Sequence, residues 1–422
     1  MAIFSRYVKE PLCRVRIKAV EAADVIRMKK LILIVGMICL MPKAKGQIVD
    51  SIFSLKSIDK TEIDALFSYY LQDGNHSAVT GGEGTEKLNV QAYCIKAKHQ
   101  LNNKYSVNWK TGIDIITSAS TDRIDYVLSS ASSVDRRVFA DVNLSVNTKS
   151  KNVFSIGTGV SAESDYLSIP IRASFQTKEK NNGSYWNFSA DAAFDDLRWG
   201  RFNPDFYYPV RLVYPIELRG TDWSQEYKRQ SYNFQSAYHF ILNKKTKMSL
   251  MGGLSLQQGI LSTPFHRIYL SNGNTVIEKL PHQRIKIPVG IQVNSFVSNQ
   301  VILKQNLALY KDNFDISAIA LEEEITWKKN PRLYLSFFAR GYMQTKAKYY
   351  TEKGRANYLD NYYTSDFDLS AFTSINTGIE IFMHPLSTKK IKPFIKGAGC
   401  RVSYYKRSDG LWAVSSSLLL KM

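Results

Sequence analysis

The densest group of chemically active side chains lies in the stretch YYLQDGNHSAVTGGEGTEKL, residues 69–88. Its imidazole and carboxylates are possible ligands for a divalent cation, but their spacing is not that of an EF-hand. A phosphate-binding loop is excluded, because GxxxxGK[ST] followed by a helix is missing. We therefore interpret residues 72–87 as an ordered, packed loop whose glycines let the backbone approach another segment closely. The residues of this motif loop are Asp73, Gly74, His76, Gly81, Gly82, Gly84 and Glu86.

Other catalytic or cofactor chemistry is not indicated by the sequence. His266 and His282 fall in one predicted loop, but no HxxxH or CxxC pattern accompanies them, so a zinc site is not expected. A nucleophile elbow with Ser, His and Asp partners is not visible either. We assign no catalytic residue, metal or cofactor, and we keep a surface enzyme with a scattered triad as the third functional alternative.

The segments between the loops alternate apolar and polar residues with a period of two, which predicts β-strands with two unlike faces. In RIKIPVGIQVN, residues 284–294, Ile285, Ile287 and Val289 share one face, and Arg284 and Lys286 share the other. The same pattern recurs in residues 137–147 and 185–195.

Charged residues on the polar faces indicate where those faces point. A charge that faces lipid near the bilayer midplane costs a few kcal/mol, so in a membrane barrel these residues should line the lumen. The candidates for lumen-facing side chains are Lys110, Asp114, Asp141, Arg172, Asp191, Asp195, Lys286, Arg340 and Glu380, with Arg284 and Asp368 on the same grounds.

The connections between strands alternate in length. Short turns such as 101–104 and 244–245 alternate with long loops such as 198–226 and 262–283. Short turns at one end and long loops at the other are typical of outer-membrane barrels, whereas sandwiches and propellers have shorter strands without this asymmetry. We predict sixteen strands, at 62–71, 88–100, 105–117, 137–148, 152–161, 166–178, 184–197, 227–243, 246–261, 284–297, 300–312, 314–328, 332–345, 366–384, 392–405 and 411–422.

The predicted fold is therefore all-β, a transmembrane antiparallel barrel with short periplasmic turns and long extracellular loops. The run LEEEITW breaks the alternation and suggests a bulge near Glu323. The aromatic and Arg-rich loop 198–226 is interpreted as a folded cap or interfacial belt, or else as a platform for a glycan or another planar ligand.

The N-terminal residues predict an export signal. Residues 28–46 combine Lys29 and Lys30 with a short apolar run and small residues before Gln47, the pattern of a cleaved signal peptide. Residues 1–27 are then an upstream extension, 47–61 a periplasmic segment, and 62–422 the barrel. The formal net charge is +19, but an exported chain rarely meets nucleic acid, so no nucleic-acid partner is expected.

Several ordered motifs resemble a known family. They are the stretch 69–88, TSASTDRID (117–125), SSASSVDRR (129–137), TPFHRIYL with EKLPHQRIKIP (263–288), and YYTSDFDLS (362–370). Together they resemble the outer-membrane barrels of domain-of-unknown-function family 3570, and they cover essentially the whole mature chain. One departure is residues 310–325, which keep only part of the pattern expected from relatives.

The resemblance implies an outer-membrane barrel but supplies no activity. We expect a pore or transport channel gated by its extracellular loops. The alternative is a non-conducting scaffold for a periplasmic or surface partner; the resemblance hints at a redox partner. The other expected partners are outer-membrane lipids and the barrel-assembly machinery that inserts the chain.

Overall fold

A computed structural model describes residues 61–118, 134–163, 166–197, 227–263, 266–357, 359–385 and 394–422. The predicted extension, signal peptide and periplasmic segment lie outside the described residues, apart from Thr61, and so does the loop 198–226.

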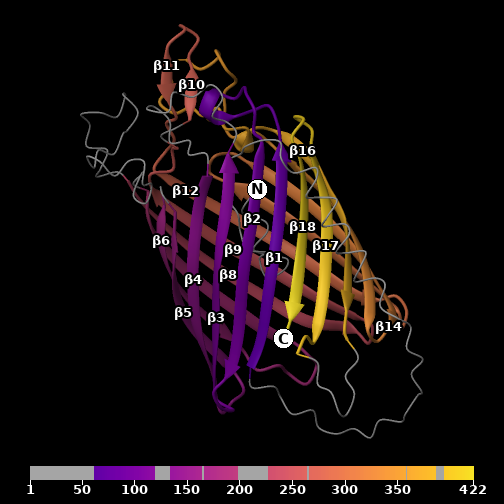
Figure 1. The fold of residues 1–422 in the computed structure, drawn as a ribbon. Helices are drawn as coiled ribbons and strands as arrows, with labels where there is room; N and C mark the ends of the chain where they lie inside the picture. Colours follow the sequence, from indigo (N-terminus) through magenta and orange to yellow (C-terminus); the bar gives the residue numbers. More distant parts are fainter. Residues whose placement is uncertain are drawn as a thin grey trace, which may run out of the picture.

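Sixteen strands form one closed barrel, and each strand pairs with two neighbours (Figure 1). They are β1 (Thr61–Asp73), β2 (Leu88–Gln100), β3 (Tyr105–Ser118), β4 (Val134–Asn147), β5 (Val153–Ala162), β6 (Leu167–Gln176), β7 (Tyr185–Asp196), β8 (Lys228–Asn243), β9 (Thr246–Gly259), β12 (Gln283–Phe296), β13 (Val301–Asp312), β14 (Ser317–Asn330), β15 (Leu333–Gln344), β16 (Phe372–Met383), β17 (Gly397–Arg407) and β18 (Trp412–Lys421).

The barrel closes between its first and last strands. β1 pairs with β18 in antiparallel register from Asp64 opposite Lys421 to Asp73 opposite Trp412. Every other neighbouring pair is antiparallel as well, and β9 pairs with β12 because the intervening hairpin of β10 (Arg267–Tyr269) and β11 (Thr275–Ile277) stands apart. The predicted fold class is confirmed.

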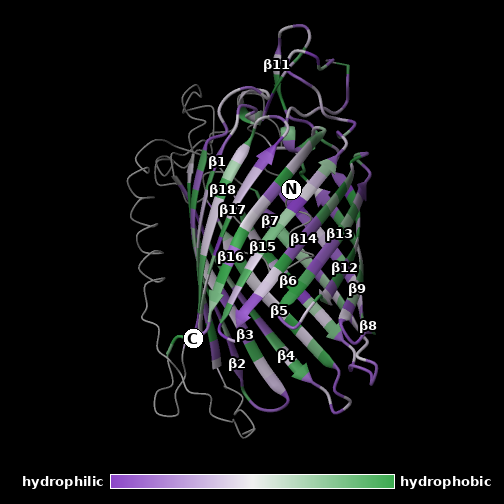
Figure 2. Cartoon of the chain, turned by 90° about the vertical axis from the view of Figure 1, so that its right-hand side faces the viewer, coloured by the Kyte–Doolittle hydropathy of each residue, from purple (hydrophilic) through white to green (hydrophobic). Residues whose placement is uncertain are grey.

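The two faces of the wall differ as the alternation predicts. Large apolar side chains such as Trp109, Phe234, Leu321 and Phe337 are exposed on the outward face. The alternate, inward positions hold most of the charged residues of the strands, together with buried apolar side chains such as Leu88, Val90 and Phe139. Figure 2 shows hydrophilic and hydrophobic patches along the strands. An outward apolar belt over a polar inner face is the arrangement of a membrane barrel with a hydrated interior.

Most predicted strand ends lie within three residues of the observed ends, but some local structure was not predicted. The hairpin of β10 and β11 was not predicted, because three-residue strands give too few alternations to recognise. β16 begins at Phe372 and not at 366, since the preceding residues form the 3-10 helix η5 (Phe367–Leu369). The side chain of Asp366 caps this helix by accepting a hydrogen bond from the Asp368 amide. Asp368 therefore lies in η5 and not on a strand face, so its predicted place on the inner wall is wrong.

The bulge predicted near Glu323 is wrong. β14 pairs continuously with β13 and β15 through Glu322, Glu323 and Glu324, and its register shifts only between Lys328 and Asn330. The alternation is therefore kept, and it turns Glu323 to the outward face beside exposed Leu321. A single 3-10 turn, η2 (Ala78–Thr80), lies between β1 and β2. Within the described ranges, no helix has the length and apolar character needed to cross a membrane.

Candidate functional site: the inner wall and the cap

The candidate site has two parts, the inner wall of the barrel and the loops at one end. The strand register places all nine strand residues predicted for the lumen on the inward face, and Arg284 with them. For example, Lys110 stands opposite Asp141, and Asp114 stands opposite Arg137. The inward face thus collects charges from strands all around the barrel.

Some inward carboxylates are held in buried ion pairs. Asp114 lies 2.5 Å from the guanidinium of Arg137, and its side chain is fully buried. Asp195 lies 2.9 Å from Arg229 and accepts a hydrogen bond of 3.0 Å from the Tyr166 hydroxyl. Buried charges need such partners, because an unpaired one would keep its full desolvation cost. These pairs fix the wall and leave little charge for a solute to meet.

Other inward charges reach into the barrel interior. Arg172 lies 2.7 Å from Asp141, with side chains that are 45% and 25% exposed. Asp191 stands opposite Arg172 in the register and accepts a 2.7 Å hydrogen bond from Asn233. These side chains are accessible charges of the wall on β4, β6 and β7.

A second network lines the wall of β13, β14, β16 and β17. Glu324 contacts Lys304 at 2.6 Å and Arg401 at 3.8 Å, and Arg401 also contacts Glu380 at 2.8 Å. The Arg401 guanidinium lies 3.7 Å from the centre of the Phe338 ring. Of these residues the sequence analysis named only Glu380. In the run of three glutamates, the register turns Glu322 and Glu324 inward and Glu323 outward.

Two further predicted residues lie on the same face. Lys286 is buried and stands opposite Asp312 in the register. The guanidinium of Arg340 lies 5.9 Å from the centre of the Tyr342 ring, and Arg340 stands opposite Glu322. The wall therefore carries both cations and anions.

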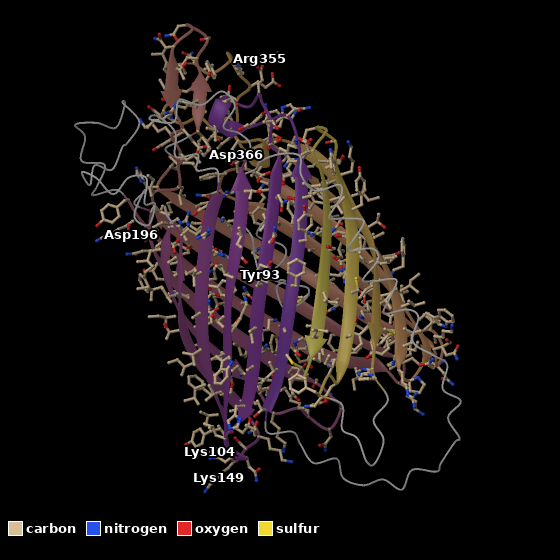
Figure 3. The ribbon with its side chains drawn as sticks, viewed as in Figure 1. Tyr93, Lys104, Lys149, Asp196, Arg355 and Asp366 are labelled. Carbon is tan, nitrogen blue, oxygen red and sulfur yellow. The ribbon has the colours of Figure 1, made fainter. Side chains whose placement is uncertain are left out.

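The long-loop end of the barrel carries a structure that we call the cap. We define it as residues 74–87, 260–263, 266–282, 345–357, 359–371 and 408–411. Figure 1 shows β10 and β11 standing above the barrel at this end, and Figure 3 places Arg355 and Asp366 there, opposite Lys104 and Lys149 at the short-turn end.

The cap packs onto the inner wall through an apolar cluster. Leu369 and Ala347 of the cap and Phe314 of the β13–β14 turn are buried against Tyr342 and Phe372 of the strands. Because these strand residues point inward, the cap covers part of the barrel mouth from inside.

The motif loop is joined to distant parts of the cap through His76. Its ring stacks on Phe367 with ring centres 3.7 Å apart. Its Nδ1 lies 3.1 Å from the Gly82 carbonyl oxygen, and its Nε2 lies 3.1 Å from the Asp409 carbonyl oxygen. The imidazole therefore links the β1–β2 loop, the β15–β16 loop and the β17–β18 turn.

The glycines of the motif loop lie where backbone and side chains crowd. Gly81 has a φ of +79°, and a Cβ there would lie 2.3 Å from the ring of Tyr269 in β10. Gly82 and Gly84 also have positive φ, and Gly74 abuts the Glu86 carboxylate. Only glycine fits such a position without strain.

The acidic residues of the motif loop accept hydrogen bonds from its own backbone. Glu86 accepts from the His76 amide at 3.0 Å, and Asp73 accepts from the Gly74 amide at 2.9 Å. Burial raises the pKa of the Glu86 carboxyl above its ordinary value, and the hydrogen bond from the His76 amide opposes that rise. Among the residues that the structure describes, no three His, Cys, Asp or Glu side chains are grouped so as to hold a metal ion.

Arg407, which the sequence did not single out, joins the wall to the cap. Its guanidinium lies 2.6 Å from Asp368 in η5, contacts Asp409 in the next turn, and lies 4.3 Å from the centre of the Phe372 ring. Its side chain is only 2% exposed. The predicted strand ended at 405, so nothing in the local sequence marked Arg407.

A closed, sixteen-stranded antiparallel barrel with an outward apolar belt, a charged interior and long loops at one end belongs to the class of outer-membrane β-barrels. Within that class, the chain belongs to the family described as "Protein of unknown function (DUF3570)", whose model matches residues 125–411.

Three solved structures show a likeness of fold. A bacterial polysaccharide outer membrane secretin is 11% identical, with 85% of this chain and 98% of that chain covered and a TM-score of 0.42. OpdQ of Pseudomonas aeruginosa is 8% identical, with 86% and 98% covered and a TM-score of 0.40. The siderophore receptor PirA of Pseudomonas aeruginosa is 11% identical, with 82% and 56% covered and a TM-score of 0.38, so this chain spans about half of that receptor. No match to a curated protein was found.

Proposed function

We propose that this chain is a channel of the outer membrane and that the cap restricts entry into it. The observation that carries the proposal is the half-exposed pair of Arg172 and Asp141 on the inward face of a closed barrel. Ionised side chains that keep a quarter or more of their surface accessible need water or a polar solute beside them.

The size of the barrel supports the same proposal. A barrel of about eight strands is filled by its own side chains, whereas one of about sixteen leaves room for an aqueous passage. The wall presents both cations and anions, so the passage should accept small polar solutes of either charge.

The cap is the part of the proposed channel that restricts entry. It packs on the inner wall through Leu369 and is tied to β17 by Arg407. A structure held by a few buried contacts at the mouth can restrict passage when docked and permit it when released. In this proposal the belt contacts outer-membrane lipids, the barrel-assembly machinery inserts the chain, and a partner protein is not required.

The proposed orientation puts the cap outside the cell and the short turns in the periplasm. Asn272→Cys in the β10–β11 turn and Lys244→Cys in the β8–β9 turn both replace exposed residues. A membrane-impermeant maleimide should label Asn272→Cys in intact cells, and it should label Lys244→Cys only after the outer membrane is permeabilised. Labelling of Lys244→Cys in intact cells would show the opposite orientation.

Ion conductance separates the channel from the alternative of a non-conducting scaffold. A scaffold barrel would insert into a planar bilayer without current steps, whereas a channel would produce them.

A further inference from the structure

The outward face of β14 carries a carboxylate in the middle of its apolar belt. Glu323 is the seventh of the 14 residues of this strand and is exposed. Its same-face neighbours along the strand are Leu321 and Ile325, which are also exposed. Across the strand pair, its Oε1 accepts a 2.8 Å hydrogen bond from the Nε2 of Gln305.

This placement differs from that of the other charges on the outward face. Throughout the described strands, all other charged side chains of that face lie within three residues of a strand end, as Arg136, Lys311 and Lys406 do. Strand ends lie at the water interface, where a charge is tolerated, but a carboxylate at mid-strand faces the hydrocarbon. Gln305 satisfies one of its acceptor sites, and the remaining ones need another polar partner.

The outward face of β15 carries two small residues beside Glu323. Ala339 of β15 stands directly opposite Glu323, and Gly341 stands opposite Leu321. A Cβ added at Gly341 would meet no atom within 4 Å. The packing of this chain therefore does not require glycine there, and the missing side chain leaves space for a neighbour.

We propose that a second copy of this chain packs in the membrane against the outward face of β13–β15 around Glu323. A two-fold axis along the membrane normal keeps each residue at its own depth, so Glu323 would meet groups of the same depth in the copy. Gln305 is such a group, because it pairs with Glu323 across the strands. A carboxamide has two N–H groups, and one of them donates to Glu323 within the chain.

The patch formed by Gln305, Glu323, Ala339 and Gly341 is therefore self-complementary, as a two-fold interface requires. Each Gln305 amide can donate one N–H to its own Glu323 and the other to the carboxylate of the copy. The small residues Ala339 and Gly341 let the two walls approach closely enough for this exchange. The proposal rests on the barrel spanning a membrane, as the proposed function does, but not on its conducting.

Disulfide crosslinking in outer-membrane vesicles tests the proposal. The background is the full chain with Cys400→Ser, since Cys400 lies on the outward face of β17. Ala339→Cys places a thiol in the patch. The matched control is Ala140→Cys, which like Ala339 is the seventh residue of its strand and lies on the outward face, but on β4, across the barrel.

We expect Ala339→Cys to give at least ten times more covalent dimer than Ala140→Cys on oxidation. Adding Glu323→Leu to Ala339→Cys should lower the yield at least tenfold, because leucine suits lipid and removes the polar contact. Equal yields from the two cysteines, no effect of Glu323→Leu, or a crosslinked product whose mass is not twice that of the chain would overturn the proposal. Should the cysteine variants fail to assemble, native mass measurement in nanodiscs decides instead: the parent chain should be dimeric and Glu323→Leu monomeric, and a monomeric parent would refute the interface.

Discussion

Replacing Arg407 by Gln is expected to raise the flux of small solutes through the reconstituted barrel at least about tenfold. Arg407 is buried between Asp368 of η5 and Asp409, and a neutral amide cannot neutralise both carboxylates. Removing one partner of a buried ion pair costs about 3–5 kcal/mol. Because the Asp368 side chain is 56% exposed, the cost here should lie near the lower figure, which lowers the equilibrium constant for the docked cap by a factor on the order of 10². The cap should then be released from the wall for much of the time.

The rate of swelling of liposomes in an isotonic sugar solution measures this flux. Arg355→Gln is the matched control, since Arg355 belongs to the same cap but is 77% exposed and forms an ion pair with Glu352 three residues away. That variant should swell at the parent rate, because an exposed ion pair contributes about 1 kcal/mol or less. If Arg407→Gln folds normally and swells no faster than the parent, the cap does not restrict entry.

The largest loss of stability is expected from Asp312→Ala. The Asp312 side chain is fully buried and lies 2.5 Å from Arg284. It also accepts hydrogen bonds from the Tyr310 hydroxyl at 2.7 Å and from the amides of Phe314 and Ile316 at 3.0 and 2.9 Å. Alanine would leave Arg284 unpaired and open the β13–β14 turn, so the free energy of unfolding should fall by about 3–5 kcal/mol.

Urea unfolding of the detergent-solubilised barrel, followed by tryptophan fluorescence, measures this change. Asp141→Ala is the control, because it removes a carboxylate from the same inner face whose pair with Arg172 is half-exposed. Its effect should stay below about 1 kcal/mol. Equal effects of the two substitutions would show that burial of Asp312 does not set the strength of its contacts.

The barrel could be predicted from sequence because the alternation of apolar and polar residues can be recognised within each strand. Strands such as β2, predicted and observed at 88–100, show several successive alternations, and each added alternation makes the period of two clearer. The bulge predicted at Glu323 shows the limit of that reasoning. A charge on the apolar face suggested a change of phase, whereas the structure keeps the phase and exposes the carboxylate.

The cap could not be predicted in the same way, because its contacts join residues far apart in the chain. His76 and Asp409 are separated by 333 positions, and Arg407 meets Asp368 only because β16 and β17 are neighbours. The glycines of residues 74–84 indicated a crowded loop but not its neighbours, which include Tyr269 of the unpredicted hairpin.

The most direct test of the channel is the current that the purified parent chain carries across a planar lipid bilayer. Stepwise increases of conductance should appear as single barrels insert, and the steps should become larger or more frequent in Arg407→Gln. Their size should scale with the salt concentration of the bath, as expected for a water-filled passage lined by Arg172 and Asp141. Correctly folded barrel that inserts into the bilayer without current steps, in the parent and in Arg407→Gln alike, would contradict the proposed channel.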